Sequence, residues 1–148
     1  MNKSALRDLA VLVARAAVGL IFVAHGWQKF TEWGLAGTSA AFGQMGVPLP
    51  SVSAWFAALV ELAGGAALVA GLAVPVAGLL LALDMVGAFV LVHAGNGVFV
   101  SGNGFELVLT LAAAALILAA VGGGRFSLDH LIAPRLIRRA GTAPAVRQ

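Results

Sequence analysis

The stretch SVSAWFAALVELAGGAALVAGL, residues 51–72, decides the fold class because it is apolar almost throughout. A run of about 20 apolar residues, rising about 1.5 Å per residue, can cross a hydrocarbon core of about 30 Å as one helix. Glu61, near its centre, is the one ionisable side chain in this run. A carboxylate at that depth costs about 3 kcal/mol to insert, so we expect it to face protein groups or trapped water. The rest of the chain is interpreted as the surroundings of Glu61.

Small residues lie on the same face of this helix as Glu61. Ala57, Glu61 and Gly65 recur at four-residue spacing, Gly64 lies beside them, and Gly71 follows near the helix end. Residues four apart share a helix face, and small side chains allow a second helix to approach closely. We therefore predict that Ala57, Gly64, Gly65 and Gly71 pack against other helices.

The composition of the whole chain is that of a membrane protein. Of its 148 residues, 61% are hydrophobic and 10% are charged, whereas soluble domains carry about 25% charged residues. The chain contains no cysteine, which excludes disulfides, thiol redox chemistry and thiolate metal ligands. The net charge of +3 arises from basic residues at the two chain ends, a pattern that does not indicate nucleic-acid binding.

Four apolar runs are separated by residues typical of turns. The predicted membrane spans cover residues 9–30, 52–72, 74–94 and 105–121. Residues 31–50 contain six Gly and Pro residues, which indicates a loop or a short helix lying on the membrane surface. Short connections make consecutive helices antiparallel neighbours. We therefore predict an all-α protein, an up-down-up-down bundle of four transmembrane helices.

The ends of the chain predict its orientation. Residues 1–132 form the expected transmembrane domain, and residues 133–148 form a basic tail. The segment FSLDHLIAPRLIRR (126–139) predicts an amphipathic helix on the inner membrane surface, with Ser127 as N-cap. Basic residues flank the first and fourth spans: Lys3, Arg7, Arg125, Arg135, Arg138, Arg139 and Arg147. The positive-inside rule then predicts a multi-pass membrane protein with both termini in the cytoplasm.

Seven ionisable side chains fall within or at the edge of the predicted spans: Arg15, His25, Lys29, Glu61, Asp84, His93 and Glu106. Such groups are costly in lipid and often line pathways, so all seven are candidates for a ligand or proton site. Glu61 and Asp84 are expected near the middle of the membrane on adjacent helices, where Arg15 could pair with either. The alternative is a structural ion pair, or a hydrogen-bonded acid, that fixes the helix packing.

The remaining candidates lie near the outer boundary of the membrane. His25 and Lys29 are one turn apart and share a face. His93 follows Asp84 by nine residues, about 180° around an ideal helix, so both should not face the bundle interior unless the helix end unwinds. A haem between His25 and His93 is a less favoured alternative. A metal site using His25, Glu106 and either Glu61 or His93 lacks a recognised ligand spacing, so no metal is predicted.

Several short motifs follow one another in a specific order: HGWQKF (25–30), FGQMGVPLP (42–50), VELAGG (60–65), GLAVP (71–75), Asn103-Gly104 followed by Glu106, and RFSLDHL (125–131). This ordered set resembles the DoxX family, small four-helix bacterial membrane proteins related to DoxD, over residues 9–132. The residues that match the family pattern are His25, Gly26, Lys29, Gly46, Pro48, Glu61, Gly64 and Gly65. The resemblance implies a four-helix bundle in the cytoplasmic membrane.

The resemblance also implies a link to oxidoreductase systems. The family name comes from a subunit of a thiosulfate:quinone oxidoreductase, and relatives are linked to redox-stress complexes. We therefore expect an accessory or quinone-contacting subunit of a membrane redox system, with other membrane or redox subunits, or further copies of itself, as partners. Because the chain has no cysteine and no recognisable cofactor motif, we expect at most a subunit of an oxidoreductase, with quinone as its candidate cofactor.

Two other functions stay open at this point. A scaffold would dock other membrane helices through the small residues Ala63, Ala67 and Gly71. A carrier of a small solute or of protons would use Glu61 and Asp84 as a relay.

Overall fold

The computed structural model describes residues 2–132, and within them the chain is helical with no strand. Its elements are α1 (Lys3–Thr31), α2 (Gly34–Gln44), α3 (Pro50–Leu59), the π-helical turn η1 (Val60–Gly64), α4 (Gly65–Ala70), α5 (Val74–Ala88), the π-helical turn η2 (Phe89–His93), the 3₁₀ turn η3 (Val100–Gly102) and α6 (Glu106–Val121). Three continuous helices, Lys3–Thr31, Pro50–Ala70 and Val74–His93, are long and apolar enough to cross a membrane, and α6 is a shorter apolar helix. The predicted all-α membrane fold is confirmed, with a fourth span shorter than the other three.

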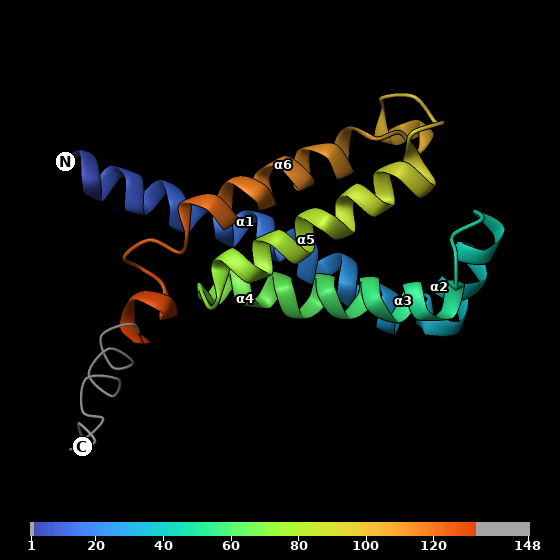
Figure 1. Ribbon diagram of the computed structural model, residues 1–148, viewed down its shortest axis with the longest axis horizontal. Helices are drawn as coiled ribbons and strands as arrows, with labels where there is room; N and C mark the ends of the chain where they lie inside the picture. Colours follow the sequence, from blue (N-terminus) through green and yellow to red (C-terminus); the bar gives the residue numbers. More distant parts are fainter. Residues whose placement is uncertain (1, 133–148) are drawn as a thin grey trace, which may run out of the picture.

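The helices form two antiparallel pairs (Figure 1). α1 packs against η1 and α4, while α5 packs against α6. The two pairs lie close together at the end of the molecule that carries the N-terminus and spread apart toward the opposite end. We call the first end the terminal end. The second, where α2 and residues 94–105 lie, is called the cavity end.

Glycine brings α1 against the helix that carries Glu61. The buried residues of α1 recur at every third or fourth position: Arg15, Gly19, Phe22, Gly26 and Lys29. A Cβ atom at Gly26 would lie 2.5 Å from the backbone nitrogen of Leu62, and one at Gly19 would lie 2.7 Å from the carbonyl oxygen of Gly65. Carbon atoms do not approach backbone atoms so closely, so this contact between backbones requires glycine.

The four residues predicted to pack against other helices take different places. A Cβ atom on Gly65 would meet α1, 2.7 Å from the Gly19 carbonyl oxygen, and one on Gly64 would meet Leu81 of α5 at 3.0 Å. Gly71 ends α4 with a φ of +72°, a left-handed conformation that glycine adopts readily. Ala57 is buried on α3. The small residues of this span therefore serve packing within the chain.

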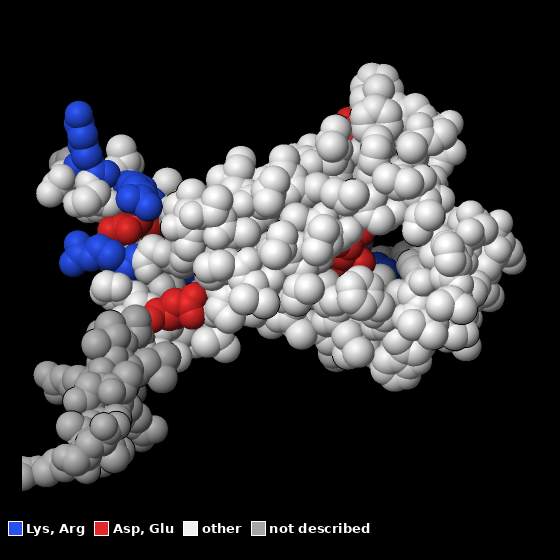
Figure 2. All heavy atoms as spheres, viewed as in Figure 1, with Lys and Arg blue, Asp and Glu red and all other residues white. Residues whose placement is uncertain are grey.

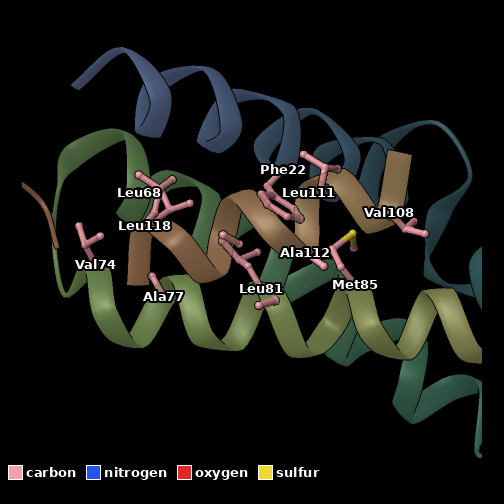
Figure 3. Packing of buried hydrophobic residues seen from close by; sticks show 12 residues of the cluster. Phe22, Leu68, Val74, Ala77, Leu81, Met85, Val108, Leu111, Ala112 and Leu118 are labelled. Carbon is pink, nitrogen blue, oxygen red and sulfur yellow. The ribbon is translucent and has the colours of Figure 1, made fainter. Parts of the chain in front are cut away.

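The apolar core fills the space between the two helix pairs (Figure 3). In this view Phe22 of α1 lies beside Leu111 of α6, and Leu68 of α4 lies beside Leu118 of α6, and all four belong to one buried cluster with Leu81 of α5. Phe22, Leu68 and Leu81 are at most 1% exposed. This core joins the pairs over the terminal half of the molecule and leaves them separate beyond it.

The segment after α6 lies at the terminal end, where α6 itself ends (Figure 1). The Ser127 Oγ atom accepts a hydrogen bond from the His130 N–H at 3.2 Å, and the helix begins at residue 128, which confirms the predicted N-cap. The Asp129 carboxylate accepts hydrogen bonds from the N–H groups of Ala73 (2.7 Å) and Val74 (3.0 Å), so it caps the start of α5. The rest of the predicted amphipathic segment, and the tail 133–148, lie outside the described residues.

Candidate ligand-binding cavity

A cavity of about 520 Å³ opens between the two helix pairs at the cavity end. In Figure 2 it is a notch in the right-hand part of the molecule, with acidic and basic atoms visible inside an otherwise uncharged surface. The charged residues that line it are Lys29, Glu61 and Asp84. A volume of this size, largely apolar with a few converging polar groups, is typical of a small-molecule site.

Lys29 and Glu61 form a buried ion pair on the wall of the cavity. The Lys29 Nζ atom donates to the Glu61 Oε2 atom at 2.6 Å, and the two side chains are 9% and 6% exposed. The contact between Gly26 and Leu62 explains the pairing, because α1 and η1 are antiparallel. Lys29 follows Gly26 by three residues, and Glu61 precedes Leu62 by one, so the two side chains meet just beyond the closest approach of the backbones.

Two histidines line the same cavity, His25 of α1 and His93 of η2. The His25 Nδ1 atom lies 2.9 Å from the Ile21 carbonyl oxygen, and the His93 Nδ1 atom lies 2.8 Å from the Asn103 carbonyl oxygen. Because a carbonyl oxygen only accepts, each Nδ1 carries the proton of its hydrogen bond. In a neutral ring the Nε2 atom of each histidine is then an acceptor.

The π turn η2 explains how Asp84 and His93 both line the cavity, although an ideal helix would put them on opposite faces. A π turn closes its hydrogen bonds over five residues, so it contains about one more residue than an α turn and shifts the following residues by about 100°. The separation of Asp84 and His93 around the helix falls from about 180° to about 80°. This is the departure from regular helix that the sequence prediction required.

One oxygen of the Asp84 carboxyl group receives no hydrogen bond from the described residues. Its Oδ2 atom is buried and has no partner. Buried carboxyl oxygens are nearly always paired with a protein group, an ion or an ordered water molecule. Asp84 therefore lines the cavity with an oxygen atom that no described residue pairs.

Arg15 lies elsewhere, so the expected pairing of Arg15 with Glu61 or Asp84 is wrong. Its guanidinium group donates to the carbonyl oxygens of Leu68 (3.0 Å), Val69 (2.6 Å) and Phe126. Arg15 precedes Lys29 by 14 residues, about 21 Å along the helix. It therefore reaches the last turn of α4, where carbonyl groups lack helical partners.

Glu106 is also separate from the cavity. Its Oε1 atom accepts a hydrogen bond at 2.7 Å from the N–H group of Val100, so it holds the loop before α6. The considered metal site from His25, Glu106 and Glu61 or His93 does not form. No group of three or more His, Asp or Glu side chains among residues 2–132 is placed to hold a metal ion.

Sequence reasoning missed some of the residues that shape the cavity. Phe42 of α2 and Phe56 of α3 contribute aromatic walls, and so does Trp33. It also assigned Lys29 and Glu61 to different depths. The glycine at position 26 was a signal for their pairing, because a glycine on the same face as Lys29 marks where another backbone comes close.

A small helical membrane bundle with a polar cavity at one end is the class of protein that these features define. The family model DoxX matches residues 10–94 of the chain. The chain belongs to the DoxX family, which confirms the resemblance seen in its motifs.

Several relatives align along most of their length. The chain is 37% identical to CatD of Bacillus subtilis, whose name provisionally describes an oxidoreductase, over 89% of this chain and 92% of CatD. It is 36% identical to the inner membrane protein YqjF of Escherichia coli, over 86% of this chain and 95% of YqjF. It is 31% identical to the inner membrane protein YphA of the same organism, over 85% of this chain and 92% of YphA. No solved structure matches the chain significantly.

Proposed function

We propose that this DoxX-family membrane protein binds a quinone or a similar small amphiphile in its cavity, as an accessory subunit of a membrane redox system. The observation that carries this proposal is the buried Lys29–Glu61 pair on the wall of a cavity of about 520 Å³. The name of the relative CatD, which describes an oxidoreductase, supports the redox assignment.

The chemistry of the pair suits a ligand with carbonyl oxygens. A lysine ammonium group has three N–H donors, and one of them is directed at Glu61. The remaining donors can bind an acceptor in the cavity, where the low dielectric strengthens a charged hydrogen bond. Apolar side chains such as Phe42 and Phe56 would pack against the ring of such a ligand.

The scaffold alternative has less support. Gly71 is enclosed by Arg15 and Ser127 of the same chain, and Ala67 packs against the internal core. Of the three small residues proposed to dock other helices, only Ala63 is exposed. A partner subunit would therefore have to bind another surface.

The redox proposal predicts that substitutions of His25 and His130 differ in their effect on quinone binding. We expect His25→Gln to lower the amount of quinone that co-purifies with tagged protein from native membranes, because His25 lines the cavity. His130→Gln is the matched control, since His130 is exposed at the terminal end. Proteins and extracted lipids would both be measured by mass spectrometry. Retention of redox subunits without any quinone would favour the scaffold instead.

We also propose that the protein lies in the cytoplasmic membrane with both termini in the cytoplasm and the cavity end outside. Basic side chains gather at the terminal end (Figure 2), where Lys3 and Arg7 belong to the start of α1 and Arg125 lies 4.0 Å from Asp8 of the same helix. The chain has no cysteine, so single cysteines report position cleanly. A membrane-impermeant maleimide should label Gly37→Cys in intact cells, and should label Ser4→Cys only after permeabilisation. The reverse pattern would contradict this orientation.

A further inference from the structure

The cavity has an open side between α3 and α5. Phe56 of α3, Leu83 of α5 and Leu91 of η2 line the cavity, yet they are 50%, 57% and 46% exposed. Gly87 lies between these two leucines on α5, and a Cβ atom there would meet nothing within 4 Å. These residues belong to membrane-spanning helices. The opening therefore faces the bilayer, and its rim is apolar.

Asp84 lies one turn from this opening, on the same helix as Leu83 and Gly87. Its Oδ2 atom is buried and has no hydrogen-bond partner among the described residues. Lys29, the lysine on the same cavity wall, donates to Glu61, and none of its hydrogen bonds within the described residues reaches Asp84. Asp84 thus differs from Glu61, whose charge the chain itself compensates.

Asp84 lines the cavity, so a ligand bound there can contact its carboxyl group. An ionised carboxylate only accepts hydrogen bonds, whereas a neutral carboxyl group both accepts and donates. A hydroxyl group also accepts and donates, so it can satisfy Asp84 in either form. An ether or an alkyl group offers no donor and would leave the carboxyl group unpaired, at a cost typical of buried unpaired polar groups.

We propose that Asp84 is a specificity-determining residue, which selects amphiphiles that carry a hydroxyl group and reach the cavity from the bilayer between α3 and α5. This inference rests on the proposed function of the cavity and narrows its ligand class to hydroxyl-bearing amphiphiles, such as the reduced quinol form of a quinone. The hydroxyl group lies against Asp84, and the apolar part of the ligand extends past Phe56 and Leu83 into lipid.

Two probes of nearly equal shape test this inference. 4-Octylphenol carries a hydroxyl donor, and 4-octylanisole, its methyl ether, does not. Binding of each tritium-labelled probe would be measured by equilibrium dialysis against protein in lipid nanodiscs, with empty nanodiscs subtracted. We expect the natural protein to bind the phenol at least about 10-fold more tightly, the ratio expected when a hydrogen bond to a charged group is lost.

Substitutions at Asp84 test whether this residue causes the tighter binding of the phenol. Asp84→Leu should bind both probes about equally, and Asp84→Asn, which keeps one acceptor oxygen, should retain part of the preference. Glu32→Gln, an exposed change outside the cavity lining, should keep all of it. Equal binding of both probes by the natural protein, or an unchanged preference in Asp84→Leu, overturns the inference and leaves the cavity as a ligand site. Binding of neither probe contradicts the ligand site as well.

Discussion

Glu61→Gln is expected to destabilise the folded protein by about 3 to 5 kcal/mol, because it leaves the Lys29 ammonium group buried without its counter-charge. The two side chains are 9% and 6% exposed, so water cannot replace the lost partner without rearrangement. Replacing both residues by methionine should keep stability close to that of the natural protein, since an apolar pair of similar volume substitutes well for a buried ion pair. Unfolding in a single detergent would measure both effects.

The difference in unfolding free energy between Glu61→Gln and the double methionine variant tests whether the pair serves only charge compensation. Glu32→Gln is the control, because Glu32 is exposed and its bond from the Gln28 Nε2 atom can still be accepted by a glutamine oxygen. Surface changes of this kind usually cost less than about 0.5 kcal/mol. A double variant that is as unstable as Glu61→Gln would show that the pair has a role beyond charge compensation. Equal stability of Glu61→Gln and the natural protein would contradict the buried pair itself.

Gly26→Ala is expected to be the most damaging single-methyl change in α1. Its Cβ atom would lie 2.5 Å from the backbone nitrogen of Leu62, an atom that no side-chain rotation can move away. Overpacking of this kind costs about 1 to 3 kcal/mol, and a backbone contact should place it at or above the upper end. Separating α1 from η1 should also pull Lys29 away from Glu61.

Gly37→Ala gives the matched comparison for Gly26→Ala. Gly37 is also a helical glycine, but a Cβ atom there has no contact closer than 3.8 Å, to Trp33. Alanine in place of a helical glycine stabilises by about 0.5 to 1 kcal/mol where space allows. Opposite signs for the two variants in thermal unfolding are expected. Similar small effects would show that α1 and η1 lie farther apart than described.

The membrane fold could be predicted from the sequence because it depends on the length of apolar runs. The stretch around Glu61 and the sparse charges define the spans without any tertiary information. The turn at Gly71 and the cap at Ser127 follow from local backbone chemistry, and the structure contains both.

The partners of the buried charges could not be predicted in the same way. Pairing depends on how far one helix slides along another, and no apolar pattern specifies that distance. Arg15 was assigned to the wrong partners for this reason, and it binds carbonyl groups at the terminal end. The two π turns could not be predicted either. An inserted residue changes which side chains face the cavity without altering the composition.

The proposed function depends on a small amphiphile being bound in the cavity beside Lys29 and Glu61. Native mass spectrometry of the protein, released from native membranes in mild detergent, tests it most directly when the natural chain is compared with the Lys29→Met, Glu61→Met double variant. We expect a bound molecule with the mass of a quinone or similar amphiphile on the natural protein, and its loss from the folded double variant. The same bound molecule on both proteins, or none on either, would contradict the claim.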